Sequence, residues 1–418
     1  MRKSTRSVVA MRLRHHPVST TLGCALVLAA LCAPRANAQI AVSLQAAMTL
    51  VGGDDFAEDL NDMNRGDSRF GSVRALVLGR GKINDTTSLY LEVPIDLAAT
   101  SSTWLTYMRP FIRMERLGSA DWLNLQVGKL PTLVGAYGER SNSTGNALIG
   151  VPLLFYYHTA VRSRLAVEGP DYFFEDGVRG GGFRGIFGGP VTSFQGAPLL
   201  YDACWEVGSE VYGAHRGVEY SLAGTMGSVS RPAISENYND GYGVTGRLGY
   251  IFRDGALFGL RLGVSAAAAP YLDAGIVDDP DFPSGADVED YLNTYVGGDL
   301  TYARGPWQFF GEVGRVGYEV PNVDPRLTAT SYYAEIVRDF GPQWSLGVRQ
   351  EGVFFSDLTA SDGRTGTWDH DLGRIEAMIN FRFRHGTMLR AGYQKTWFPD
   401  AGTLDAELFA LQLQVWTR

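Results

Sequence analysis

Charged side chains recur at alternate positions along many short apolar segments of this chain. In residues 370–383, for example, Arg374, Glu376 and Arg382 have even numbers, whereas most apolar side chains have odd numbers. Successive side chains of a strand point to opposite faces, so such a segment predicts a strand with one charged and one apolar face. Opposed rows of charge across a narrow aqueous passage create a transverse field, which is typical of an ion-selective pore.

The parity of each segment identifies the residues that share its polar face. The arginines with this parity are Arg74, Arg80, Arg109, Arg113, Arg247, Arg261, Arg349, Arg374, Arg382 and Arg390. The glutamates are Glu92, Glu206, Glu210, Glu219, Glu312, Glu335, Glu351 and Glu376. Arginine suits such a wall because it stays charged and its planar fork holds anions at two points. The same residues could instead pair with neighbours and make the wall rigid, so both roles stay open at this stage.

Two other segments contain residue types that enzymes use. Asp369-His370-Asp371 places carboxylates beside a base, and residues 177–189 are rich in glycine. The first segment has no accompanying nucleophile or acid-pair motif. The second lacks the Lys-Ser/Thr of a phosphate-binding loop. We therefore predict that the protein is not an enzyme and has no cofactor.

Acidic residues cluster in two predicted loops, at 54–62 and 278–290. Oxygen ligands of this kind bind Ca²⁺, but neither cluster has the spacing of an EF-hand. Solvated acidic loops are the simpler interpretation. A Ca²⁺ ion, or a divalent bridge to lipopolysaccharide, is the alternative.

A two-residue period recurs along the chain from residue 40 onward. The segments that follow it are 40–51, 69–83, 88–97, 104–117, 122–130, 203–213, 218–227, 242–252, 256–267, 292–303, 307–317, 329–338, 343–353, 370–383, 387–397 and 405–416. Their lengths suit tilted transmembrane strands of about 9–11 residues. We predict an all-β fold, a transmembrane antiparallel β-barrel of about sixteen strands. Residues 160–167 and 190–200 could form a further hairpin, which would make eighteen.

The connections between these segments alternate in length. Short ones, such as 84–86 and 384–386, contain the Gly, Asp or Asn that tight hairpins favour. Long ones are 52–68, 131–201, 228–241, 268–291, 318–328 and 356–369. The alternation predicts one rim facing the periplasm and one facing outside, with both ends of an even-stranded barrel on the short-turn side. Aromatics near the strand ends are predicted to form two interfacial girdles: Tyr242, Tyr250, Phe252, Tyr302, Trp307, Trp344, Trp397 and Phe398.

The first 38 residues have the pattern of an export signal. A basic start precedes an apolar stretch at 22–31 and the small residues Ala36-Asn37-Ala38. We predict a signal peptide at 1–38, with translation from Met1 or Met11, and a barrel at 39–418. The chain has 37 Lys and Arg and 45 Asp and Glu; six of the basic residues and no acid precede residue 39, so the mature net charge is −14. This charge opposes a nucleic-acid role, and Cys204 alone cannot form an internal disulfide.

The connection at 131–201 is far longer than the others, and long connections in compact proteins are usually functional. Its stretches 128–140 and 146–153, together with 237–262, resemble the corresponding regions of the phosphate-selective porin O/P group. The chain is also similar to the general porins, sixteen-stranded barrels whose loop between strands five and six folds into the lumen. The resemblance implies that 131–201 does the same. Phosphate selectivity does not carry over, because Lys82, Lys129 and Lys395 are the only lysines after residue 38.

The resemblance implies passive diffusion of small hydrophilic solutes across the bacterial outer membrane, and a homotrimer. Outer-membrane lipid, lipopolysaccharide and the solutes are the expected partners. A substrate-specific channel and a structural or adhesive barrel are the alternatives. The predicted lining of the constriction comprises the ten arginines above with Glu206, Glu210, Glu139, Arg140, Glu175 and Asp176.

Overall fold

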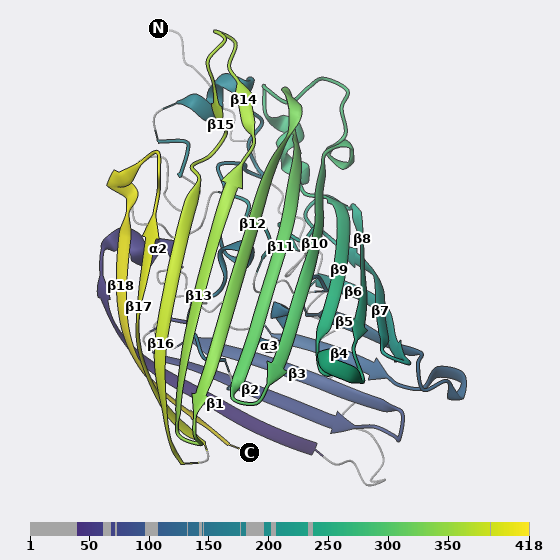
Figure 1. The fold of residues 1–418 in the computed structure, drawn as a ribbon. Helices are drawn as coiled ribbons and strands as arrows, with labels where there is room; N and C mark the ends of the chain where they lie inside the picture. The colour runs from purple at the N-terminus through teal and green to yellow at the C-terminus, as the bar shows by residue number, and fades with distance from the viewer. Residues whose placement is uncertain are drawn as a thin grey trace, which may run out of the picture. The chain divides into compact units, whose positions relative to one another are not determined.

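The computed structural model describes residues 40–61, 68–71, 73–96, 108–131, 133–141, 144, 146–175, 177–180, 196–201, 206–232, 237–384 and 386–417. The predicted signal peptide and Cys204 lie outside these ranges. Within them, sixteen antiparallel strands close into a barrel in which the first strand pairs with the last (Figure 1). The predicted sixteen-stranded barrel is therefore confirmed.

The barrel strands follow one another in chain order around the wall. They are β1 Ile40–Gly53, β2 Val73–Lys82, β3 Thr87–Asp96, β4 Arg109–Met114, β5 Asn124–Leu130, β6 Glu206–His215, β7 Val218–Met226, β8 Tyr242–Ile251, β9 Arg261–Pro270, β10 Leu292–Arg304, β11 Trp307–Val320, β12 Val323–Phe340, β13 Trp344–Phe355, β16 Leu372–Arg384, β17 Thr387–Trp397 and β18 Ala406–Trp416. The connections hold a separate hairpin, β14 Asp357–Thr359 and β15 Thr365–Thr367, and the helices α2 Asp55–Leu60 and α3 Tyr137–Arg140. They also hold the 3-10 turns η2 Leu117–Ser119, η3 Leu153–Phe155, η4 Pro170–Phe174, η6 Gly255–Leu257, η7 Ala274–Asp278, η8 Val288–Asp290 and η9 Gly402–Leu404.

Two connections differ from their predictions. The expected long loop at 318–328 is wrong, because β11 and β12 continue until Val320 pairs with Val323. Asn322 makes this turn with a φ of +62°, a left-handed conformation that asparagine adopts more readily than most residues. β9 begins at Arg261 rather than at 256, because the 3-10 turn η6 and Gly259, with a φ of +85°, precede it.

The predicted extra hairpin is not seen in the part of the chain that the structure describes. Residues 160–167 contain no strand, and of 190–200 only 196–200 are described. There Pro198 forms an isolated bridge with His158. The long loop therefore contributes no strand to the barrel from its described residues.

Side chains sort by face as the two-residue period predicts. At the seam between β1 and β18, Leu50 and Leu411 lie opposite each other and are exposed on the outer face. Thr49 and Gln412 are buried on the inner face, where Gln412 Nε2 donates a 3.0 Å hydrogen bond to Thr49 Oγ1. An apolar outside around a polar inside is the arrangement that a barrel surrounded by lipid requires. None of the helices within the described ranges is long and apolar enough to cross a membrane.

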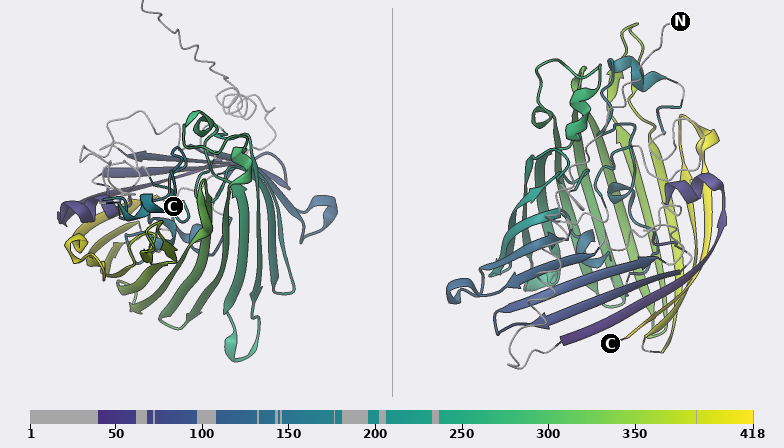
Figure 2. Two further views of the ribbon diagram at one scale, coloured as in Figure 1. Left: turned by 90° about the horizontal axis from the view of Figure 1, so that it is seen from above. Right: turned by 180° about the vertical axis from the view of Figure 1, so that it is seen from behind.

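A hydrophobic core lies among the long connections and the inner wall instead of between packed sheets. It includes Tyr157, Phe173 and Trp368, all fully buried. Seen from above, segments of the connections between the strands lie within the ring of strands (Figure 2). Phe398 belongs to this core and is 2% exposed, with its ring centroid 5.9 Å from that of Phe56. Its prediction as a girdle aromatic is wrong, because packing against α2 turns it away from the outer face.

Candidate functional site

Four glutamates form a row around one side of the inner wall. Glu312 lies on β11, Glu335 on β12, Glu351 on β13 and Glu376 on β16, and these strands are consecutive in the barrel. All four side chains are buried. Because a buried carboxylate is costly unless it is paired or hydrogen-bonded, the partners of this row decide what it does.

Glu312 receives the start of the long loop. Its Oε1 accepts hydrogen bonds from the backbone N–H groups of Ala136 at 2.8 Å and Tyr137 at 2.6 Å, and from the Tyr333 hydroxyl at 2.9 Å. Gly135 precedes these donors with a φ of +68°. A Cβ at Gly135 would collide with the Glu312 carboxylate, so glycine is needed for this close approach.

Glu335 receives the first arginine of the loop. Arg140, at the end of α3, donates from Nη1 to Oε1 at 2.7 Å and from Nη2 to Oε2 at 2.9 Å. The Arg140 guanidinium carbon lies 3.9 Å from the Phe310 ring centroid, and Nη1 also donates to Asn146 at 3.1 Å. A two-pronged contact of this kind is among the strongest polar contacts in proteins and orients the loop as well as holding it.

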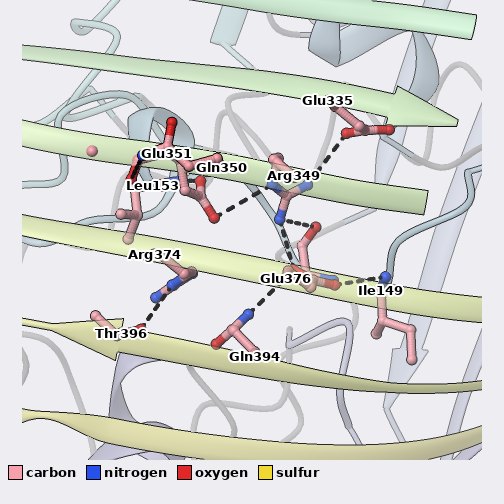
Figure 3. A network of polar contacts seen from close by, with 12 residues as sticks. Ile149, Leu153, Glu335, Arg349, Gln350, Glu351, Arg374, Glu376, Gln394 and Thr396 are labelled. Carbon is pink, nitrogen blue, oxygen red and sulfur yellow. Dashed lines mark hydrogen bonds and ion pairs between the residues drawn. The ribbon is translucent and has the colours of Figure 1, made fainter.

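Glu376 and Glu351 hold the next stretch of the loop. Glu376 Oε1 accepts from the N–H groups of Ile149 at 3.1 Å and Gly150 at 2.8 Å, and Glu351 Oε2 accepts from Leu153 at 2.6 Å. Figure 3 shows Ile149 beside Glu376 and Leu153 beside Glu351. A Cβ at Gly150 would collide with the Glu376 carboxylate, so this contact also needs glycine.

Arg349 links the glutamates to one another (Figure 3). Its Nη2 donates to Glu376 at 2.8 Å and to the Gly150 carbonyl at 2.9 Å. Its other nitrogens lie 3.4 Å from Glu351 and 3.5 Å from Glu335. On the neighbouring strand, the Arg374 side chain donates from Nε to Thr396 at 3.1 Å. These two arginines are 1% and 0% exposed, so they lie beneath the loop and compensate the charge that anchors it.

A further anchor lies at the long-loop rim. The Asp369 carboxylate accepts from the N–H groups of Ala160 at 2.8 Å and Gly180 at 2.7 Å, and from the Tyr157 hydroxyl at 3.3 Å. Burial raises the pKa of Asp369 to about 6, against the opposing effect of these donors. Burial also lowers the pKa of His370, whose ring packs against Phe398 at 6.4 Å between centroids. Asp369 thus ties the loop to the segment before β16, a use that the Asp-His-Asp pattern does not indicate.

The strands β3 to β10 hold separate charge pairs on the inner wall. Arg109 lies 3.5 Å from Glu92, Arg247 lies 2.7 Å from Asp299, and Arg261 lies 2.5 Å from Glu219. Asp299 is a partner that the prediction does not include, although its place opposite Glu312 in the register puts it on the same face. Here the wall is internally paired, as the rigid-wall interpretation expects.

The remaining predicted lining residues occupy several environments. Arg390 is buried and its Nη2 lies 3.5 Å from the Thr144 carbonyl, whereas Arg382 is exposed. Glu206 and Glu210 are buried, and Gln126 donates to Glu210. Arg74 is half-buried, Arg80 is exposed, Arg113 is half-buried and Glu175 is exposed beside η4. Asp176 and the side chain of Glu139 lie outside the described residues.

The structure brings Arg140, Arg349 and Arg374 together with the glutamate row, whereas Arg109, Arg247 and Arg261 pair with acids on β3 to β10. Contact between solutes and any of these residues stays a prediction. Parity indicated that the four glutamates face inward, but nothing in the sequence marks them as anchors. No three acidic, histidine or cysteine side chains among the described residues meet in a way that would hold a metal ion.

Comparison with solved structures places the fold among bacterial porin-type barrels. The anion-selective porin from Comamonas acidovorans has 10% sequence identity and a TM-score of 0.53, covering 91% of this chain and all of that one, 100%. OmpT lacking loop L8, an outer-membrane protein of Vibrio cholerae, has 12% identity and a TM-score of 0.51, covering 91% and 99%. Neither a protein-family model nor a curated protein matches the chain. At this level of identity the similarity establishes the fold.

Proposed function

We propose that the protein is a passive diffusion channel for small hydrophilic solutes in the bacterial outer membrane. The observation that carries this proposal is the row of four buried glutamates that holds the long loop against the inner wall of a closed barrel. A barrel that only needed stability would not require a loop pinned inside it at backbone N–H groups. A fixed loop narrows the lumen to a constant bore, which is how a diffusion channel sorts solutes by size.

The apolar outer face sets the partners of the barrel. It would contact outer-membrane lipid, with lipopolysaccharide around the long-loop rim, and three copies would assemble as a trimer. The resemblance to the porin O/P group supports this class without its phosphate selectivity. Native mass measurement of the detergent-extracted protein tests the trimer, and a mass of one chain would overturn it.

Planar-bilayer recording tests the channel itself. The purified mature protein is expected to insert as discrete, equal conductance steps. Deletion of 146–153 removes the loop N–H groups that donate to Glu376 and Glu351 and is expected to enlarge each step. Absence of steps from correctly folded wild-type protein would contradict the proposal and favour a structural or adhesive barrel. Steps of unchanged size in the deletion variant would show that the constriction lies elsewhere.

A substrate-specific channel is the second candidate. The fully buried aromatic core among the connections, including Tyr157 and Trp368, favours it because packed side chains leave less of the lumen open. A conductance that saturates with one class of solute would support this candidate over general diffusion.

A further inference from the structure

Two arginines near the short-turn rim lie against aromatic rings on the inner wall. Arg80 is two residues from the end of β2, and Arg113 is the second-last residue of β4. Their guanidinium carbons lie 5.3 Å and 4.9 Å from the centroid of the same ring, Tyr90. The Arg113 guanidinium also lies 5.5 Å from the Tyr212 ring centroid. Rings at these distances hold a guanidinium in place by cation–π attraction without forming an ion pair with it.

The pairing of charges distinguishes these two arginines from those on the neighbouring strands. Arg109, Arg247 and Arg261 each lie within ion-pair distance of an acid. Arg80 and Arg113 make no ion pair with any acid in the described part of the chain. Both guanidinium groups lie against the Tyr90 ring, so an anion beside that ring would be attracted by two positive charges.

Gln126 shields Arg113 from the acid on the next strand. Arg113 Nη2 donates to Gln126 Oε1 at 3.2 Å, and Gln126 Nε2 donates in turn to Glu210. The amide therefore orients the guanidinium plane without neutralising it. Because a guanidinium fork matches a carboxylate at two points, its remaining donors suit a ligand carboxylate.

The rings themselves offer an apolar surface beside the charges. Tyr90 stacks on Phe111 with centroids 4.8 Å apart and planes within 3° of parallel. Phe111 is buried, whereas Tyr90 and Tyr212 are half-buried and keep part of their surface toward the lumen. A planar ring attached to the carboxylate can pack on that surface in an offset stack.

We propose that Arg80, Arg113, Tyr90 and Tyr212 form a binding site for an aromatic carboxylate at the short-turn end of the lumen. The proposal rests on the proposed channel function and names a solute class for it. The carboxylate contacts the two guanidinium groups, and the ring lies against the tyrosines. Solutes that have passed the anchored loop meet this site before they leave the barrel.

Calorimetric titration of the whole folded protein in detergent tests the site without requiring conductance. The probes are benzoate, cyclohexanecarboxylate, which has the charge but no aromatic ring, and benzamide, which has the ring but no charge. Benzoate is expected to bind saturably, about threefold more tightly than cyclohexanecarboxylate because of the stacking. Benzamide is expected to bind about tenfold more weakly because the charge-assisted contact is lost.

Three variants assign the binding to these residues. Arg113→Gln is expected to weaken benzoate binding about tenfold. Tyr90→Leu is expected to make benzoate and cyclohexanecarboxylate bind equally. Arg304→Gln removes the same charge at an exposed residue at the end of β10 and is the matched control, with unchanged binding expected. If Arg113→Gln does not fold, Arg80→Gln takes its place, and the same loss of benzoate binding is expected.

The outcomes separate the site from the channel. No saturable benzoate binding, equal binding of benzoate and benzamide, or an unchanged Arg113→Gln variant overturns the site, whatever the conductance record shows. Absence of conductance steps with benzoate binding intact overturns the channel and keeps the site. The site is supported if benzoate binds saturably, the three probes follow the expected order, and binding is weakened in Arg113→Gln but kept in Arg304→Gln.

Discussion

Replacing Arg140 by methionine is predicted to release the long loop from the inner wall. Arg140 is 14% exposed and its partner Glu335 is 1% exposed, so removing the arginine leaves a buried carboxylate. Among the described residues, Glu335 then keeps the weaker contact with Arg349 at 3.5 Å, and Arg349 is already shared with Glu351 and Glu376. Breaking a buried pair at one partner costs about 3 kcal/mol, which lowers the ratio of docked to undocked loop by about 150-fold.

Removing the charge of Glu335 instead of Arg140 should destabilise loop docking less. In Glu335→Gln, the guanidinium of Arg140 retains Asn146 at 3.1 Å, the Phe310 ring at 3.9 Å and the new amide oxygen. We expect a loss of about 1 kcal/mol, the value of one ordinary hydrogen bond. The double variant Arg140→Met/Glu335→Leu removes both charges and should return docking to within about 1 kcal/mol of the wild type.

Hydrogen exchange at the loop amides measures docking directly. The N–H groups of Ala136 and Tyr137 donate to Glu312 and exchange only when the loop leaves the wall. Arg326→Met, at an exposed ion pair with Glu319, is the control and should leave these amides unchanged. If Arg140→Met and Glu335→Gln accelerate exchange equally, or not at all, the reasoning from buried charge is refuted.

Three further changes test the other anchors. Gly135→Ala should weaken docking of the loop by at least about 1–2 kcal/mol, because the alanine would have a left-handed backbone and its Cβ would collide with Glu312. Gly275→Ala, which adds a Cβ in open space, is the control and should leave docking unchanged. Thermal unfolding compares the two variants, and equal melting temperatures would argue against the close approach. Trp368→Ala should destabilise the packing of the loop by about 3–5 kcal/mol, because Trp368 is fully buried. Trp122 is half-exposed, so Trp122→Ala should cost much less. Near-ultraviolet circular dichroism follows both variants, and similar losses would contradict the proposed core. The raised pKa of Asp369, about 6, means that Asp369 binds a proton more tightly when the loop is docked than when it is free. The contribution of Asp369 to the stability of docking is therefore complete below about pH 4, falls as the pH rises to about 6 and then stays constant. The total change is about 3 kcal/mol. The rate of proteolysis at the rim measures this pH dependence, and Asp369→Asn should remove it. An identical pH profile in the wild type and the variant would refute the role of Asp369.

The strands could be predicted because lipid outside and water inside impose one rule on every strand. Predicted and observed bounds agree at 387–397 and differ by one residue at 242–252 and 405–416. Agreement fails where the chain leaves the bilayer and that rule no longer applies. At 318–328 the strands extend beyond it, and the turn is set by the single residue Asn322.

The site could be predicted only as far as its faces. Parity placed Glu376 and Arg349 on the inner wall, and their contacts there are observed. The partners of Glu376 could not be predicted, because they are the backbone N–H groups of Ile149 and Gly150, which any residue but proline carries. The prediction for Phe398 is wrong for a related reason. An aromatic residue at a strand end suits lipid or a buried core equally well, and tertiary packing against Phe56 decides which of the two it contacts.

Closure of the barrel has a consequence for how the chain assembles. The Leu44 N–H donates to Thr417 Oγ1 at 2.8 Å across a separation of 373 residues. The entropy of closing such a loop grows by only about 0.6 kcal/mol for each doubling of length, so the seam costs little at equilibrium. Its cost is kinetic, because contacts so distant in sequence form late. Until β18 reaches β1, the growing sheet has two unpaired edges that can template aggregation, so assembly depends on protecting both edges until the last strand arrives.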